Sequence, residues 1–179
     1  RELPLEILTS AAQNPEYVHH VDAVLSRFHK EIATKRGWFY EAVPGSEYLP
    51  IVYFSAEYGL HHSLPFYAGG LGFLAGDYLK ECSDLGVPLI AVGFMYPEGY
   101  LRQKMRADGW QDNVDEALDR NAAPITVVLD EQGKQRVIKI PFIDPPIHVA
   151  IWKVMVGKIP LYLMDTDIDR NDPWNRVIS

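Results

Sequence analysis

Residues 50–86 constrain the fold most, because they combine three different signals in a fixed order. Residues 51–54, Ile-Val-Tyr-Phe, form a short apolar run of the kind found in buried strands. In residues 73–85 apolar side chains recur with helical spacing, and a glycine and a proline follow as stop signals. A glycine cluster at residues 69–72 stands where that helix would begin. The stretch therefore predicts a strand, a long loop and a helix with a glycine-rich start.

The glycine cluster is the best candidate for a binding site. The first N–H groups of a helix have no intrahelical partner, and the helix dipole favours negative charge there. Gly69, Gly70 and Gly72 carry no Cβ, so a ligand can approach the backbone closely. The cluster predicts a site for a phosphate or a polar sugar-phosphate group. The competing interpretation is a helix start that only packs closely.

A second alternative is a dinucleotide-binding fingerprint, which Gly70, Gly72 and Gly76 partly imitate. That fingerprint needs its glycines in the tight turn directly after the strand. Here about 14 residues separate Phe54 from Gly69, which disfavours the dinucleotide interpretation.

The remaining pattern predicts an α/β fold with an N-terminal helix and a β-rich C-terminal part. Residues 14–36 have a helical apolar stripe, and residues 87–95 read as a second buried strand, which completes a strand–helix–strand unit. Four further strand candidates follow from residue 124, at residues 125–129, 136–142, 147–156 and 159–164. A turn-rich stretch near residue 46 suggests two parts, a helical segment 1–46 and an incomplete Rossmann-like domain 47–179.

Composition excludes several classes of function. The net charge is −7 and no Lys/Arg cluster is present, so nucleic-acid binding is not expected. No run of 18 apolar residues occurs, so no transmembrane helix is expected. The single cysteine, Cys82, excludes an internal disulfide and fits a cytoplasmic protein; its mid-helix position on the apolar side predicts a buried, inert thiol.

Two side chains at the carboxyl end of the first strand are further candidates. Ligands bind at that edge in open α/β sheets, and a carboxylate there can accept hydrogen bonds from sugar hydroxyls. Glu57 and Tyr58 occupy this position. The alternative role for Glu57 is a loop carboxylate that caps a neighbouring N–H group.

No metal site is predicted. Glu57 and His61 have the spacing of a helical metal site, but the intervening residues do not favour a helix. The acidic run 165–171 imitates the start of a calcium loop, yet Arg170 and Arg176 stand where glycine and glutamate are required.

Five motifs, in this order and spacing, resemble the N-terminal part of the α-glucan (glycogen) phosphorylases, in particular their shorter bacterial and archaeal branch. They are Tyr53–Leu60, Tyr67–Asp77, Leu85–Pro88, Gly93–Tyr96 and Asp108–Gln111. The resemblance implies a glycosyltransferase-B fold, in which two Rossmann-like domains face each other across a cleft. It implies an enzyme that cleaves α-1,4-glucan with inorganic phosphate to α-glucose 1-phosphate, with pyridoxal phosphate bound to a lysine of the C-terminal domain.

Transferred to this sequence, the resemblance implies that Gly69, Gly70, Leu71 and Gly72 face the glucosyl unit and phosphate, and that Glu57 or Tyr58 approaches the cofactor. The cofactor lysine and the basic residues for the substrate phosphate belong to the half that this chain lacks. We therefore expect no catalytic residue here, a fragment that is inactive alone, and partners limited to glucan, phosphate and a possible second copy. The alternatives are a nucleotide-sugar glucosyltransferase, related to starch or glycogen synthase, and a stand-alone carbohydrate-binding module.

Overall fold

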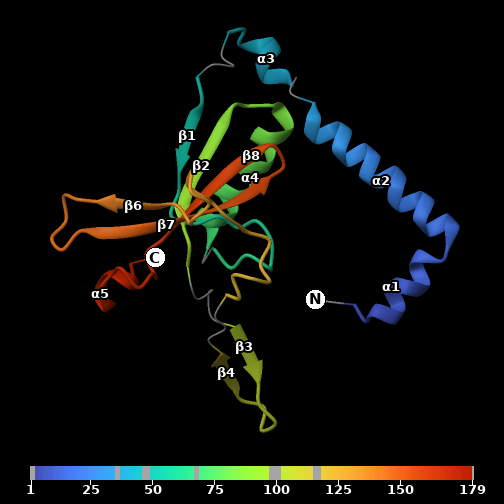
Figure 1. Cartoon of the computed structure of the whole chain (residues 1–179). Helices are drawn as coiled ribbons and strands as arrows, with labels where there is room; N and C mark the ends of the chain where they lie inside the picture. The colour runs from blue at the N-terminus through green and yellow to red at the C-terminus, as the bar shows by residue number, and fades with distance from the viewer. Residues whose placement is uncertain are drawn as a thin grey trace.

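The structure is a computed structural model that describes residues 3–34, 37–45, 49–66, 69–96, 102–114 and 118–178. Helices predominate in the first part of the chain and strands in the later part (Figure 1). In chain order they are α1 (Leu5–Ala12), α2 (Pro15–Ala33), α3 (Trp38–Ala42), β1 (Ile51–Phe54), α4 (Gly70–Leu85), β2 (Leu89–Phe94), β3 (Arg102–Met105), β4 (Gln111–Val114), β5 (Thr126–Val127), β6 (Val137–Ile140), β7 (Ile147–Val156), β8 (Ile159–Asp165) and α5 (Pro173–Arg176).

A mixed six-stranded sheet forms the centre of the molecule. Its order is β1-β2-β8-β7-β5, and β6 also pairs with β7. The strands β1, β2 and β8 run parallel, whereas β7 is antiparallel to β8, β5 and β6. The last strand of the chain, β8, therefore lies between β2 and β7. The predicted α/β class is confirmed, with a mixed sheet.

The strand–helix–strand unit predicted from the central stretch is confirmed. The strands β1 and β2 are parallel neighbours, with Ile51 opposite Leu89 and Phe54 opposite Val92, and α4 connects them. Strands also form in all four segments predicted after residue 124, although β5 is reduced to two residues.

Two local features differ from the sequence-based expectation. An additional helix, α1, precedes α2, and residues 102–114 form an antiparallel hairpin, β3–β4, that was not predicted. Residues 120–122 form a turn rather than a helix. Asp119 explains this, because its carboxylate accepts hydrogen bonds from the backbone N–H groups of Asn121 and Ala122 and so competes with a helix.

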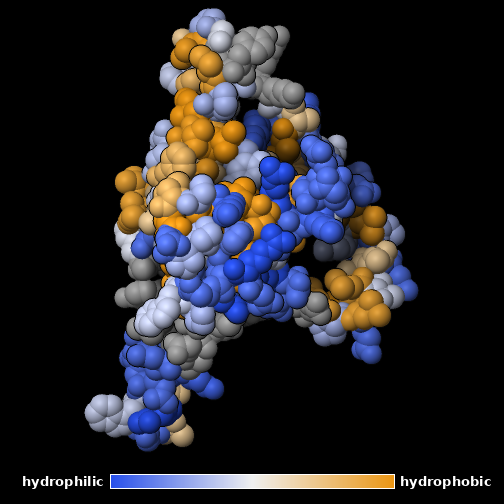
Figure 2. All heavy atoms as spheres, turned by 60° about the vertical axis from the view of Figure 1, so that its left-hand side comes forward, coloured by the Kyte–Doolittle hydropathy of each residue, from blue (hydrophilic) through white to orange (hydrophobic). Residues whose placement is uncertain are grey.

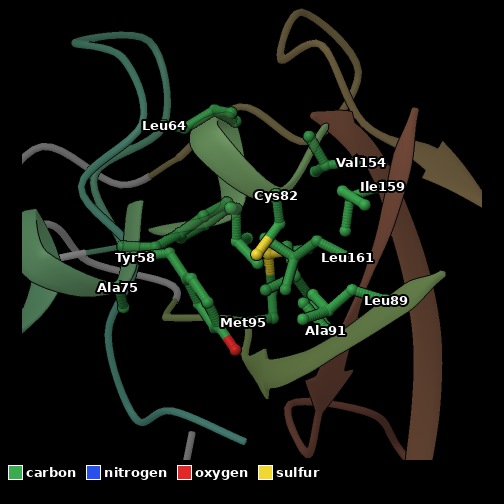
Figure 3. Close-up of a cluster of buried hydrophobic side chains, with 13 residues drawn as sticks. Tyr58, Leu64, Ala75, Cys82, Leu89, Ala91, Met95, Val154, Ile159 and Leu161 are labelled. Atoms are coloured by element: carbon green, nitrogen blue, oxygen red, sulfur yellow. The ribbon is translucent and has the colours of Figure 1, made fainter. Parts of the chain in front are cut away.

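The core lies between α4 and one face of the sheet (Figure 3). Alternate residues of β2 and β8 are buried, as expected for strands with one covered face. The loop after β1 adds two large aromatic side chains to this core. Its fully or almost fully buried members are Tyr58, Phe66, Leu79, Met95, Ile159, Leu161 and Leu163. Each large apolar side chain buried here contributes about 1.5–3 kcal/mol.

The N-terminal helices are built differently. Asn14 caps α2, since its side chain accepts hydrogen bonds from the backbone N–H groups of Glu16 and Tyr17. Neither α1 nor α2 has a buried residue, and the two extend away from the sheet as an arm (Figure 1). None of the described helices combines the length and apolarity needed to cross a bilayer. The predicted boundary near residue 46 falls outside the described residues and stays a prediction.

Apolar side chains also reach the surface. Figure 2 shows them gathered in the upper part of the molecule, whereas the β3–β4 hairpin at the bottom is mainly hydrophilic. Several belong to β1 and the exposed side of α4, namely Val52, Phe54, Leu71, Phe73, Leu74 and Tyr78. Three of them, Leu71, Phe73 and Leu74, belong to the first turns of α4, where the candidate site lies.

Candidate functional site at the start of helix α4

The glycine loop, residues Gly69–Gly72, forms the N-terminal end of α4. Gly69 is the N-cap residue and has an extended backbone, and its carbonyl accepts hydrogen bonds from the N–H groups of Gly72 (3.1 Å) and Phe73 (3.4 Å). Among the described residues, the N–H groups of Gly70 and Leu71 have no hydrogen-bond partner. Gly69, Gly70 and Leu71 are exposed, whereas Gly72 is buried. Two open amides at the positive end of a 16-residue helix can bind an anion.

The space above the loop is open on the side of the first two glycines. A Cβ atom added to Gly69 or Gly70 would meet no atom within 4 Å. Neither residue has the positive φ that requires glycine. Backbone conformation and packing within the described residues therefore do not explain why both positions are glycine. A ligand that comes close to the backbone would explain them.

Gly76 has a different role, which removes support from the dinucleotide alternative. A Cβ atom there would collide with the backbone oxygen of Gly59 and would lie 2.8 Å from its carbonyl carbon. The Gly59 N–H donates to the carbonyl of Gly72 over 2.7 Å, so the loop after β1 runs directly against α4. Gly76 and Gly59 are thus glycines because two backbones pack together.

Glu57 lies beside the glycine loop and makes the contact expected for the alternative role, a carboxylate that caps a neighbouring N–H group, while ligand binding by Glu57 stays a prediction. One carboxylate oxygen, Oε2, accepts a hydrogen bond from the Gly69 N–H over 3.3 Å. The Ser55 hydroxyl donates to the Glu57 backbone carbonyl over 2.9 Å and accepts from the Glu57 N–H over 3.4 Å. The structure therefore brings Glu57 and Gly69 together across 12 residues, and the carboxylate caps the first amide of the loop.

Tyr58, the neighbour of Glu57, points into the protein. Its side chain is 1% exposed, and its hydroxyl donates to the carbonyls of Tyr53 (3.2 Å) and Val92 (3.0 Å), at the ends of β1 and β2. Burial is the main cause that raises the pKa of this phenol to about 12, and the charge on Tyr53 adds to it. The Tyr58 side chain thus packs into the core, and the approach of Glu57 or Tyr58 to a cofactor stays a prediction.

Sequence reasoning missed Tyr96, which stands just beyond β2. Its hydroxyl donates to the carbonyl of Ala56 over 2.9 Å. Burial raises the pKa of this phenol, and the negative charge of Glu57 raises it further. A tyrosine at the carboxyl end of a parallel strand adjacent to β1 was the available signal, because such ends meet at one edge of the sheet.

The remaining candidates do not contribute to this site. Within the described ranges, no cluster of His, Cys, Asp or Glu could hold a metal ion. His61 Nδ1 lies 2.9 Å from the Ser63 hydroxyl, within its own turn. Cys82 is buried, and burial raises the pKa of its thiol, which agrees with an inert cysteine.

The acidic run after β8 is structural. Asp165 is buried and accepts hydrogen bonds from Trp152 Nε1 (2.9 Å) and Arg120 (3.2 Å). Burial outweighs the Arg120 charge and raises the pKa of this carboxyl group. Asp167 pairs with Arg176 over 2.8 Å, so arginines rather than calcium neutralise the run.

Comparisons with known proteins agree with the resemblance seen in the motifs. A family described as "Protein of unknown function (DUF3417)" matches residues 1–64. A glycogen phosphorylase of Aquifex aeolicus is 55% identical over 130 residues, which are 73% of this chain and 19% of that protein. A maltodextrin phosphorylase of Thermococcus litoralis is 37% identical over 177 residues, 99% of this chain and 21% of that protein. A glycogen phosphorylase of Mycobacterium tuberculosis is 46% identical over 123 residues, 68% of this chain and 14% of that protein.

The chain belongs to the α-glucan phosphorylase family. It spans about a fifth or less of the length of the curated relatives it matches, which the resemblance places in their N-terminal part. The glycine loop and Glu57 both fall in the motifs that first suggested this family.

The resemblance implies a pyridoxal phosphate that is bound to a lysine amine outside this chain. The described lysine that follows the glycine loop most closely, Lys80, lies in the body of α4, and its ammonium group is 3.4 Å from Asp77. The open amides of Gly70 and Leu71 suit a phosphate group. The position of the cofactor lysine stays a prediction.

Proposed function

We propose that this chain supplies one wall of the glucosyl-phosphate site in an α-glucan phosphorylase. It would be part of the N-terminal Rossmann-like domain of a glycosyltransferase-B fold and would act on stored glucan in the cytoplasm. The observation that carries the proposal is the pair of open amides at Gly70 and Leu71, beside a fixed carboxylate at the carboxyl ends of parallel strands.

The reaction would be phosphorolysis of a terminal α-1,4-glucosyl unit. A phosphate oxygen forms a bond to C1 of the glucosyl unit, the bond from C1 to the glucan oxygen breaks, and that oxygen takes up a proton supplied by the phosphate. The products are α-glucose 1-phosphate and a glucan shortened by one unit. The amides of Gly70 and Leu71 would hold the negatively charged phosphate oxygens near C1 throughout.

Glu57 would act as a boundary of this phosphate position. Its carboxylate accepts the hydrogen bond of the Gly69 N–H and would repel a phosphate at that position. Phosphate would therefore bind at the amides of Gly70 and Leu71. Pyridoxal phosphate would be held by polypeptide outside the described residues; when bound, it supplies acid–base chemistry through its phosphate.

The first test uses the chain alone. Mixed with maltodextrin, inorganic phosphate and pyridoxal phosphate, it should form no glucose 1-phosphate, because the resemblance implies a cofactor lysine outside this chain. Formation of glucose 1-phosphate would contradict the proposal that the catalytic groups lie outside this chain. Tight binding of maltooligosaccharides in calorimetry would favour a stand-alone carbohydrate-binding module instead.

The second test uses a chimera of the Aquifex aeolicus phosphorylase. In it, the 130 aligned residues of this chain replace the corresponding residues of that protein. The chimera should release glucose 1-phosphate. The substitution Gly70→Ala places a methyl group in the open space and should raise the KM for phosphate by about tenfold, the equivalent of one charge-assisted hydrogen bond. Gly133→Ala, at a turn remote in sequence, is the control; it strains a turn whose φ is +75° but should leave this KM unchanged. Unchanged kinetics in Gly70→Ala would remove the loop from the site.

A further inference from the structure

We propose that Tyr96 is a positioning residue of the glycine loop: through the Ala56 carbonyl it fixes Glu57, whose carboxylate then holds the Gly69 N–H. The inference rests on the proposed function, because the loop that it positions is the proposed phosphate site. It assigns a role to the last residue of the Gly93–Tyr96 motif, which was not among the predicted site residues.

The base of Tyr96 is well anchored. The preceding residue, Met95, is fully buried, and its N–H donates to the carbonyl of Met164 on β8 over 2.9 Å. From this point the Tyr96 side chain reaches the loop that leaves β1, and its hydroxyl contacts Ala56 across 40 residues. Tyr96 thus ties the ends of two neighbouring parallel strands together at the edge where the site lies.

The backbone of Glu57 is held on both sides. On one side Tyr96 holds Ala56, and on the other the Tyr58 N–H donates to the carbonyl of Phe66 over 2.8 Å. The Ser55 hydroxyl adds a contact to Glu57 itself. With its main chain fixed in this way, the Glu57 side chain has little freedom to leave Gly69.

The electrostatics agree with this geometry. The Glu57 charge contributes to the raised pKa of Tyr96, so the phenol and the carboxylate lie close to each other. A raised pKa keeps the Tyr96 phenol protonated at neutral pH, so Tyr96 is a hydrogen-bond donor to Ala56. The consequence is a loop in which one amide is taken by the protein and the next two remain open.

The test is NMR spectroscopy of the 15N-labelled chain at constant pH. Tyr96→Phe removes the donor and keeps the ring. It should shift the Gly69 amide resonance in the same direction as Glu57→Gln and increase its exchange with solvent about tenfold. Tyr162→Phe is the matched control, since in the described part of the chain the Tyr162 hydroxyl makes no hydrogen bond; it should leave Gly69 unchanged.

A second variant keeps the test valid if Tyr96→Phe lowers the stability of the whole chain. Ser55→Ala removes the other side-chain contact to the Glu57 backbone and should shift Gly69 in the same direction, by less. A Gly69 resonance that responds to Glu57→Gln but to neither Tyr96→Phe nor Ser55→Ala would overturn the inference.

Inorganic phosphate added to the wild-type chain separates this inference from the proposed function. Phosphate should shift the amides of Gly70 and Leu71 more than any other described amide. No shift at these two amides would contradict the proposed phosphate site, whatever the response of Gly69 to Tyr96→Phe. A shift that persists unchanged in Tyr96→Phe, together with an unchanged Gly69, would overturn the positioning role alone.

Discussion

The tip and the body of helix α4 carry glycines for opposite reasons. At the tip, Gly70 has no atom near the position of a Cβ, and its N–H has no partner among the described residues. In the body, six residues later, a Cβ on Gly76 would collide with the backbone of Gly59. Gly70 thus leaves space that a ligand could fill, whereas Gly76 leaves space that the backbone of Gly59 fills.

The difference shows how the helix serves two purposes. Its body is fixed by packing against β2, β7 and β8, so the tip has a rigid base. A rigid base keeps the open amides of Gly70 and Leu71 in place without a ligand, which lowers the cost of ordering them on binding. Variants of the two regions should therefore affect different measurements.

The largest effect is expected for a core leucine of the body. Leu79 is fully buried, and Leu79→Ala should lower the free energy of unfolding by about 2–5 kcal/mol, because it removes buried methyl groups and leaves a cavity. Leu74, on the exposed side of the same helix, is 67% exposed, and Leu74→Ala should change it by less than about 0.5 kcal/mol. Denaturant titration measures both, and equal losses would contradict the one-sided packing of α4.

The next effect concerns Tyr58, beneath the site. Its pKa is about 12 in the folded chain and 10.0 in the reference state, so the neutral phenol is favoured by folding. The contribution of the neutral Tyr58 phenol to the free energy of unfolding is fully present below pH 10. It is lost as the pH rises toward 12, by up to about 3 kcal/mol.

Unfolding of wild type and Tyr58→Phe should be compared at pH 7, 9, 10.5 and 11.5. Above pH 10 the free energy of unfolding should fall more steeply for the wild type than for the variant. Other groups that titrate in this range are present in both proteins, so their effect drops out of the difference between the two curves. Parallel curves would show that the hydroxyl is not buried against the Tyr53 and Val92 carbonyls.

A smaller effect separates the two glycines directly. Both Gly76→Ala and Gly70→Ala gain helix propensity, so the difference between them isolates the contact with Gly59. Gly76→Ala should lower the free energy of unfolding by about 2 kcal/mol, and Gly70→Ala should leave it unchanged or raise it by up to about 1 kcal/mol. A destabilised Gly70→Ala would mean that the tip is packed rather than open.

Local signals in the sequence were sufficient for much of the fold. The apolar run at residues 51–54, the helical spacing of residues 73–85 and the long apolar run at residues 147–156 each formed the predicted element, because each depends on neighbouring residues. The hairpin β3–β4 was missed because its strands are polar and lack the alternating pattern of a half-buried strand.

Contacts between distant residues could not be predicted in this way. The spacing from Glu57 to Gly69 gives no sign of their hydrogen bond, since it depends on how the intervening loop folds back. The role of Gly76 depends on Gly59 and was likewise invisible in the sequence, where Gly76 was only part of a disfavoured dinucleotide fingerprint. The residue pattern and the family resemblance both indicated the candidate site, whereas the division between open and packed glycines required coordinates.

The position of β8 has a consequence for synthesis of the chain. Residues 159–165 leave the ribosome after the other described strands, yet they pair with β2, about 70 residues earlier, as well as with β7. Before they emerge, β2 has only β1 as a possible partner in this sheet, and the edge where β8 inserts is unpaired. Closing so long a loop is slow. A nascent chain halted before residue 159 should therefore stay sensitive to protease, and protection should appear in one step once residue 165 has emerged.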